Sequence, residues 1–206
     1  MLSLLKILWI IGITAEGMTG ALAAGRRQMD LFGVLVIGAV TAIGGGTLRD
    51  VLLGNYPLTW VKEPQYLVLI FMASLITVSW PFLLENFRRL FLILDAIGLS
   101  AFAVIGTEVA LRLGHGFIIA CVASVVTGVF GGVLRDMLCN QVPLVFRKEL
   151  YAAVAVLATC VYCGLAQLGI SEPVNAAVSV LIAFLIRILA IWKSWRLPVF
   201  EYQERD

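Results

Sequence analysis

The chain has 206 residues, of which 61% are hydrophobic and only 14% are charged, and its mean hydropathy is +1.00. A soluble globular domain carries roughly 25% charged and 45–50% apolar residues, so this composition excludes an ordinary water-soluble enzyme and a disordered protein. The net charge of +2 is too small to indicate a nucleic-acid partner.

Long apolar segments follow one another along the whole chain, and about 20 apolar helical residues are enough to cross a bilayer. In chain order they are Ile7–Gly25, Leu31–Leu48, Gln65–Leu84, Phe91–Leu111, Phe117–Leu134, Leu150–Ser171 and Val174–Trp192. Only the first, fourth and seventh contain charged residues. We therefore predict an all-α integral membrane protein with seven transmembrane helices, forming a single membrane domain over residues 1–206.

The chain contains an internal repeat. A shift of 86 positions aligns Thr41–Leu58 with Thr127–Leu144 without a gap, and nine of the 18 aligned pairs are identical. Each half has three predicted helices, an odd number, so the second half must enter the membrane from the opposite side, as an inverted repeat. We place repeat 1 at about 4–85, repeat 2 at about 90–171 and the extra seventh helix at about 174–194.

The Lys and Arg residues outside the helices are unevenly divided between the two predicted sides. Nine lie on one side and three on the other, with three more left out as candidates for positions within the membrane. Because cytoplasmic loops carry an excess of Lys and Arg, we expect the N-terminus outside and the C-terminus in the cytoplasm. The expected location is the inner (plasma) membrane.

The second and fifth predicted helices each carry a glycine run followed by an arginine and an aspartate. The two sets are Gly44, Gly45, Gly46, Arg49 and Asp50, and Gly131, Gly132, Arg135 and Asp136. Each helix glycine costs about 1 kcal/mol relative to alanine, so we predict that both helices are broken at these glycines. Within a bilayer, an unwound segment needs protein or a water-filled cavity beside it, where its freed carbonyl groups favour a cation. Close helix packing is the alternative role for the glycines.

Successive residues on a helix point about 100° apart, so we expect Arg49 and Asp50 to pair poorly with each other. Their expected partners are the charged groups or the freed backbone of the other repeat.

Further polar residues interrupt the apolar helices. Glu16, midway along the first helix, is expected to face an ion pathway, and a hydrogen-bonded packing role is its alternative. Thr41 and Thr127 either line the constriction or bond back to their own helices. Asp95 and Glu108 are expected near the solvated ends of the fourth helix.

Little in the sequence indicates catalysis or a bound metal. His115 is the only histidine, and Cys160 and Cys163 lie within a predicted helix. We therefore expect no enzymatic activity, no metal and no cofactor. Arg187 in the seventh helix is expected to extend toward the membrane surface, with its charged end near Trp192.

Together, these motifs resemble the bacterial members of the trimeric intracellular cation (TRIC) channel family, also described as glycine-transporter-domain membrane proteins. The match covers almost the whole chain, and Gly44–Asp50 and Gly131–Asp136 look like the two signature motifs of the family. The resemblance implies a homotrimer among membrane lipids, with one hourglass pore in each subunit, lined by the first, second, fourth and fifth helices. It also implies conduction of monovalent cations, with K⁺ weakly favoured over Na⁺. The residues Phe91–Leu111 include no counterpart of the lysine that animal members carry on the fourth helix.

Two functions fit the residues taken alone. One is a cation channel, and the other is a secondary transporter for glycine or another small zwitterionic solute, because inverted repeats with broken helices are a transporter device. The resemblance favours the channel. A scaffold or an intramembrane enzyme is a third alternative, which the lack of a nucleophile–base pair disfavours.

Overall fold

The computed structural model describes residues 4–80, 87–147, 150–193 and 195, and the regular structure within these ranges is entirely helical. The long helices are α1 (Leu4–Arg26), α2 (Leu31–Leu53), α4 (Gln65–Ser79), α6 (Phe87–Arg112), α7 (Phe117–Leu138), α9 (Tyr151–Gln167) and α10 (Glu172–Lys193). Two helices of four residues, α3 (Thr59–Lys62) and α8 (Leu144–Arg147), lie between α2 and α4 and between α7 and α9.

Each predicted transmembrane segment overlaps one long helix. Five of these helices, namely α1, α2, α6, α7 and α10, are long and apolar enough to cross a membrane. The other two, α4 and α9, are shorter, with 15 and 17 residues. Residues 81–84, with which we ended the third predicted segment, lie outside the described residues. The all-helical fold is therefore confirmed, with five spanning candidates.

Local signals set the two ends of α2. At its start, the side chain of Asp30 accepts a hydrogen bond of 2.8 Å from the backbone N–H of Gly33, which satisfies one of the unpaired donors of the first turn. At its end, Gly54 adopts the left-handed conformation with φ of 66°, which a glycine adopts readily and a helix C-terminus often uses. The helix therefore ends after its glycine run, not at it.

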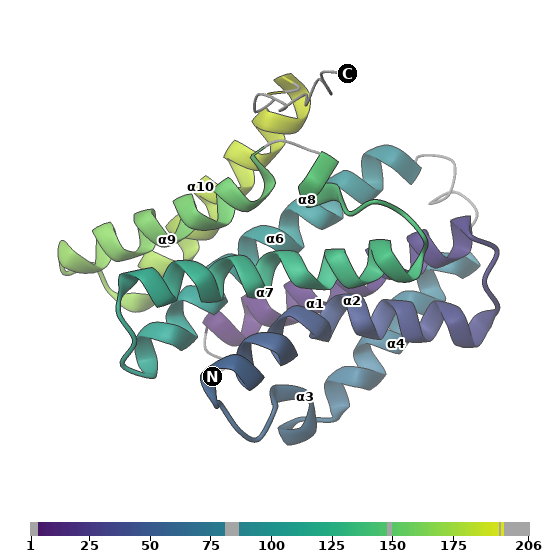
Figure 1. Cartoon of the computed structure of the whole chain (residues 1–206), viewed down its shortest axis with the longest axis horizontal. Coiled ribbons are helices and arrows are strands. Elements are labelled where there is room, and N and C mark those ends of the chain that lie inside the picture. Colours follow the sequence, from purple (N-terminus) through teal and green to yellow (C-terminus); the bar gives the residue numbers. More distant parts are fainter. Residues whose placement is uncertain (1–3, 81–86, 148–149, 194, 196–206) are drawn as a thin grey trace, which may run out of the picture.

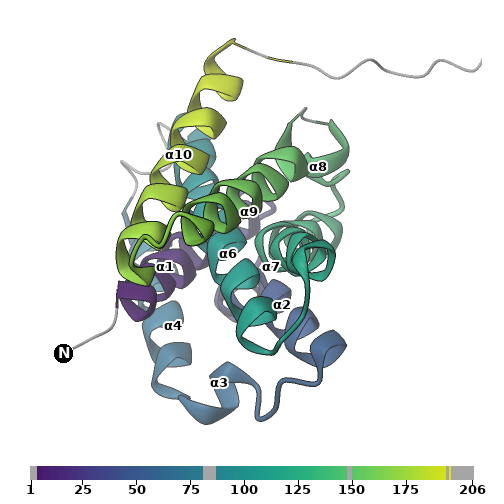
Figure 2. The same ribbon diagram turned by 90° about the vertical axis from the view of Figure 1, so that its left-hand side faces the viewer.

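Four helices form the centre of the molecule, and the others flank them. In both views of the ribbon, α9 and α10 lie on one side of the group formed by α1, α2, α6 and α7, and α3 and α4 lie on the opposite side (Figures 1 and 2). The contacts agree, because α4 packs against α1 and α2, whereas α9 packs against α7, α6 and α10. The charged residues singled out in the sequence lie mainly on the four central helices.

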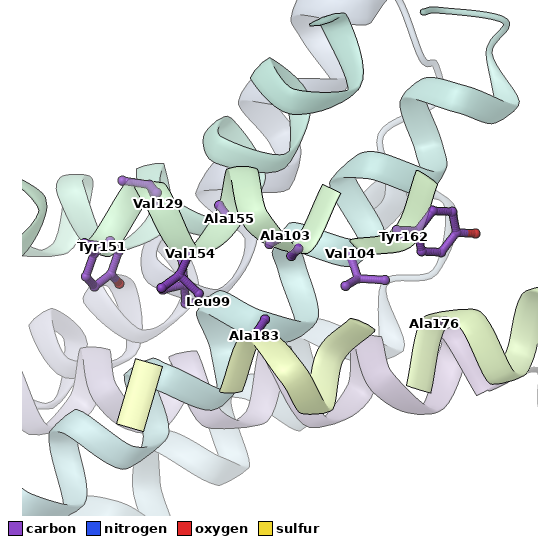
Figure 3. Packing of buried hydrophobic residues seen from close by; sticks show 11 residues of the cluster. Leu99, Ala103, Val104, Val129, Tyr151, Val154, Ala155, Tyr162, Ala176 and Ala183 are labelled. Carbon is purple, nitrogen blue, oxygen red and sulfur yellow. The ribbon is translucent and has the colours of Figure 1, made fainter. Parts of the chain in front are cut away.

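Small side chains bring the flanking helices close to the centre. The cluster in Figure 3 joins α6, α7, α9 and α10, and its larger members include Leu99, Val104 and Val154. Between them lie Ala103, Ala155 and Ala183, each with no exposed surface. Small residues of this kind let membrane helices approach closely, where van der Waals packing holds them together.

The outer surface carries large apolar side chains. Phe32, Ile118 and Leu168 are each at least 75% exposed, on α2, on α7 and directly after α9. A soluble monomer rarely exposes many such residues together. This surface suits contact with lipid, as the five spanning candidates require.

Candidate functional site

The glycine runs of α2 and α7 lie where these two helices meet. Gly45 faces the backbone carbonyl of Thr127, and Gly131 faces that of Thr41, so closely that a Cβ atom on either glycine would clash with the oxygen. Gly44 lies at the same contact, beside a leucine side chain of α7. Both helices run through their glycines without interruption. The predicted breaks are therefore wrong, because the glycines allow close packing while the backbone stays helical.

The last glycine of each run lies beside the arginine that follows it. A Cβ atom on Gly46 would lie 3.8 Å from Nη2 of Arg49, and one on Gly132 would lie 3.4 Å from Nη2 of Arg135. Residues three apart share one face of a helix. Each arginine therefore lies along its own helix, over the space that the glycine leaves.

The two threonines bond back to their own helices. Thr41 Oγ1 donates to the carbonyl of Ile37, and Thr127 Oγ1 donates to that of Ala123, each at 2.6 Å. Of the two roles left open for these residues, the structure shows back-bonding. The backbone carbonyl groups of the two threonines face Gly45 and Gly131 across the contact between α2 and α7.

Arg49 and Asp50 form a buried ion pair. Nε and Nη2 of Arg49 donate to Oδ1 of Asp50 at 2.9 and 2.7 Å, and Nδ2 of Asn55 donates to the same oxygen at 2.8 Å. The expectation that these neighbours pair poorly is wrong, because the arginine side chain is long enough to curve back to the next carboxylate. The expected bond to the charged pair of α7 does not occur among the described residues.

Arg135 ties three helices together. Its Nε donates to Oδ1 of Asp136, the next residue, at 2.8 Å. Its Nη1 donates to Oδ1 of Asp95 on α6 and to Oγ1 of Thr19 on α1, both at 3.1 Å. Oε2 of Glu16, also on α1, lies 3.7 Å from the same nitrogen. We call Arg135, Asp136, Asp95 and Glu16 the Arg135 cluster.

Two carboxylates of this cluster are more deeply buried than the sequence indicated. Asp95 has no exposed surface, so the expectation of a solvated position is wrong, because α1 and α7 pack over this part of α6. Glu16 is 3% exposed, accepts a hydrogen bond of 2.8 Å from Thr19 and lies against Gly98. Glu16 is thus hydrogen-bonded within α1 and packed against α6.

The carboxylates on α1 and α6 have aromatic counterparts in the other half of the chain. The shift of 86 positions relates Glu16 to Phe102 and Asp95 to Trp9. Phe102 and Trp9 line a small pocket together with the arginine and aspartate of α2. One arginine is therefore enclosed by acidic groups, and the other lies beside a partly open, aromatic pocket.

Arg187 of α10 is also buried, at 1% exposed. Its guanidinium lies 4.4 Å from the centre of the Tyr151 ring, and its Nε and Nη2 have no hydrogen-bond partner among the described residues. The expectation that this side chain extends to the membrane surface is wrong, because the guanidinium is buried against the ring of Tyr151 on α9. Glu108 lies nearer a helix end, as expected, and its carboxylate is 3.5 Å from Arg112.

Metal ligands do not gather in the described part of the chain. No group of three or more His, Cys, Asp or Glu residues there is placed to hold a metal ion. The four cysteines are free thiols. The acidic groups at the centre instead surround a guanidinium, so the chemistry of this site is electrostatic.

Comparisons with known proteins match nearly the whole chain. A family model described as "Glycine transporter" matches it twice, over residues 6–81 and 92–167. The UPF0126 inner membrane protein YadS of Escherichia coli K12 is 38% identical over 201 residues, which is 95% of each chain. The UPF0126 membrane protein YvgT of Bacillus subtilis 168 is 34% identical over 195 residues, which is 94% of this chain and 95% of the relative.

Solved structures match equally widely. The TRIC trimeric intracellular cation channel orthologue of Rhodobacter sphaeroides superposes with a TM-score of 0.88 at 37% identity, covering 93% of this chain and 98% of that one. A structure that describes the basis of conductance through TRIC cation channels gives a TM-score of 0.87 at 39% identity, covering 97% and 98%.

The spanning candidates, the apolar surface and the buried charges define an integral membrane protein. The two family-model matches and the relatives then fix its family. The chain belongs to the glycine-transporter-domain family of bacterial TRIC-type membrane proteins.

Proposed function

We propose that this protein is a cation channel whose ion pathway runs between α1, α2, α6 and α7. The observation that carries the proposal is the likeness to solved TRIC cation channels, with TM-scores of 0.86 to 0.88 at 35 to 39% identity. The likeness extends over at least 93% of this chain. It therefore includes all four central helices and both arginine–aspartate pairs.

The buried charges support this placement of the pathway. Charged side chains within a membrane are costly and are usually functional. Apart from Arg187 on α10, the fully buried charged residues lie on the four central helices, and each signature arginine is neutralised by the aspartate that follows it. A passing cation would then avoid an uncompensated positive charge. We assign Glu16, Arg49, Asp50, Arg135 and Asp136 to the wall of the pathway. The stretches of α2 and α7 that hold these side chains in place contain Thr41, Gly44, Gly45, Gly46, Thr127, Gly131 and Gly132.

The finer features of the proposal follow from the family and from the sequence. The channel is a homotrimer that conducts K⁺ and Na⁺, with one pathway in each subunit. Each subunit crosses the inner membrane seven times as two inverted repeats, at about 4–85 and 90–171, followed by a helix at about 174–194. The family model, which matches twice with an offset of 86 residues, supports these repeats. The N-terminus lies outside and the C-terminus lies in the cytoplasm.

The test is electrical recording from purified protein in a planar lipid bilayer. With KCl at unequal concentrations on the two sides, a cation channel gives discrete current steps that reverse near the K⁺ equilibrium potential. Replacing K⁺ with Na⁺ should leave the steps in place. Protein-free bilayers and bilayers with an unrelated membrane protein are the controls, and the absence of steps in active preparations contradicts the proposal.

A second candidate function is the transport of glycine or another small zwitterion. The description of the family model favours it. Proteoliposomes loaded with glycine separate the two candidates. Saturable uptake of labelled glycine, stimulated by internal glycine and not accompanied by current steps, would establish the transporter instead.

A further inference from the structure

Acidic groups are unequally divided between the two signature arginines. Three carboxylates lie within 4 Å of Arg135, from Asp136, Asp95 and Glu16. With all of them ionised, the Arg135 cluster carries two negative charges in excess. Among the described residues, Arg49 has a single carboxylate at that distance, so its pair is electrically balanced.

The difference in the number of nearby carboxylates comes from the neighbouring helices and not from the signature motifs. Both motifs contain the same arginine and aspartate, 86 positions apart. The extra carboxylates come from α1 and α6, as Glu16 and Asp95, whereas the corresponding positions near α2 hold Phe102 and Trp9. An apolar ring carries no ionisable group, so the two halves of the pathway differ by two carboxyl groups.

Hydrogen bonds do not fully satisfy the excess negative charge. Oδ2 of Asp95 is buried and has no hydrogen-bond partner among the described residues. Arg187 lies against the Tyr151 ring, 4.4 Å from its centre. Even if the charge of Arg187 is counted in full, the balance around Arg135 stays negative while all three carboxylates are ionised.

We propose that Glu16 and Asp95 are the residues that make the pathway prefer cations over anions. The proposal rests on the channel function. A buried charge acts through an effective dielectric constant well below that of water, so its field reaches ions several ångströms away. Rings of acidic side chains give other cation channels their charge selectivity in the same way. The signature arginine–aspartate pairs, being balanced, contribute little to this preference.

The experiment measures reversal potentials in a KCl gradient, from which the ratio of K⁺ to Cl⁻ permeability follows. Glu16→Gln and Asp95→Asn should each lower this ratio by about a hundredfold. One unit charge at about 12 Å, with an effective dielectric constant of about 20, changes the K⁺ permeability by about tenfold and the Cl⁻ permeability by about tenfold in the opposite direction. Glu16→Asp keeps the charge and should keep the ratio. Glu172→Gln removes an exposed carboxylate at the start of α10, outside the four central helices, and it should leave the ratio unchanged.

An added charge makes the test independent of whether the neutral variants fold. Phe102→Glu places a carboxylate beside Arg49, at the position that corresponds to Glu16, and it should raise the permeability ratio. Size-exclusion chromatography identifies variants that do not fold. A conducting wild type whose ratio is unchanged in every folded variant overturns this inference alone. A wild type without current overturns the channel function and this inference with it.

Discussion

Glu16 on α1 and Phe102 on α6 are related by the shift of 86 positions, and each lies against a glycine of the other's helix. Glu16 packs on Gly98, and Phe102 packs on Gly12, which are themselves 86 positions apart. The backbone contact is the same on both sides, but one side chain is charged and the other is an aromatic ring. The same packing thus produces two different electrostatic environments.

The glycines between α2 and α7 should be intolerant of a side chain. Gly45→Ala and Gly131→Ala each drive a methyl group into a backbone carbonyl, and backbone cannot move aside as a flexible side chain can. We expect each to lower the free energy of unfolding by about 1–3 kcal/mol. Thermal unfolding of the purified protein in detergent measures the effect.

Gly164 provides the matched control. It is also a helical glycine, on α9, but a Cβ atom there meets nothing within 4 Å. Gly164→Ala should therefore be neutral or stabilise by up to about 1 kcal/mol, because alanine favours the helix. Equal destabilisation by all three variants would contradict the packing role of Gly45 and Gly131.

The two signature aspartates should differ in their effect on stability. Asp50→Asn leaves Arg49 without a carboxylate within 4 Å, and breaking a buried pair in this way costs about 3–5 kcal/mol. Asp136→Asn leaves Arg135 with Asp95 and Glu16, so we expect a loss of roughly half as much or less. The midpoints of thermal unfolding compare them, with Glu108→Gln as the control. A larger loss for Asp136→Asn would contradict the charge balance described here.

The two fully buried arginines should also respond differently to an apolar substitution. Arg187→Met removes a guanidinium with two unbonded nitrogens, and methionine keeps most of the volume. Its effect on the free energy of unfolding should lie within about 1 kcal/mol of zero, or be stabilising. Arg135→Met leaves three carboxylates facing one another and should cost about 3–5 kcal/mol. Unfolding of both variants in the same detergent tests the contrast, which equal losses would contradict.

A surface ion pair ties the start of α1 to the segment before α4. Nζ of Lys6 donates to Oε2 of Glu63 at 2.9 Å, and this bond lowers the pKa of the Glu63 carboxyl below its ordinary value of 4.5. Because the pKa is lowered in the folded protein, the stabilisation is present above pH 4.5 and is lost as the pH falls through the folded pKa.

The pKa of Glu63 can be measured directly by NMR titration of its side-chain carboxyl carbon. Lys6→Met should raise this pKa toward 4.5, because it removes the hydrogen bond that contributes most to the shift. A titration that is the same with and without Lys6 would show that the pair does not form in solution. Because both side chains are partly exposed, added salt should weaken the effect.

The sequence predicts the helices well and their internal contacts less well. A run of about 20 uncharged apolar residues is a strong signal, and every predicted segment overlaps a long helix. The glycine runs are ambiguous, because the same residues permit either an opened backbone or a close helix contact. The structure shows a close helix contact, because the carbonyl of Thr127 lies opposite Gly45. The sequence of α2 alone does not indicate this contact with α7.

The candidate site was predicted only in part. The pairs of Arg49 with Asp50 and of Arg135 with Asp136 stand out because each motif occurs twice. Asp95 does not stand out in the sequence, because its burial depends on how α1 and α7 pack over α6. The repeat gives no signal either, because the residue 86 positions earlier is Trp9 and not a second carboxylate. A usable signal was that a carboxylate within an apolar helix needs a buried partner.

The crossing of α2 and α7 has a consequence for the origin of the molecule. Gly45 meets the carbonyl of Thr127, Gly131 meets that of Thr41, and each half supplies one glycine and one carbonyl. Each half of the chain therefore carries both elements of this contact. The contact therefore fits an origin of the chain by duplication of one three-helix unit, as the internal repeat and the two matches of the family model also indicate.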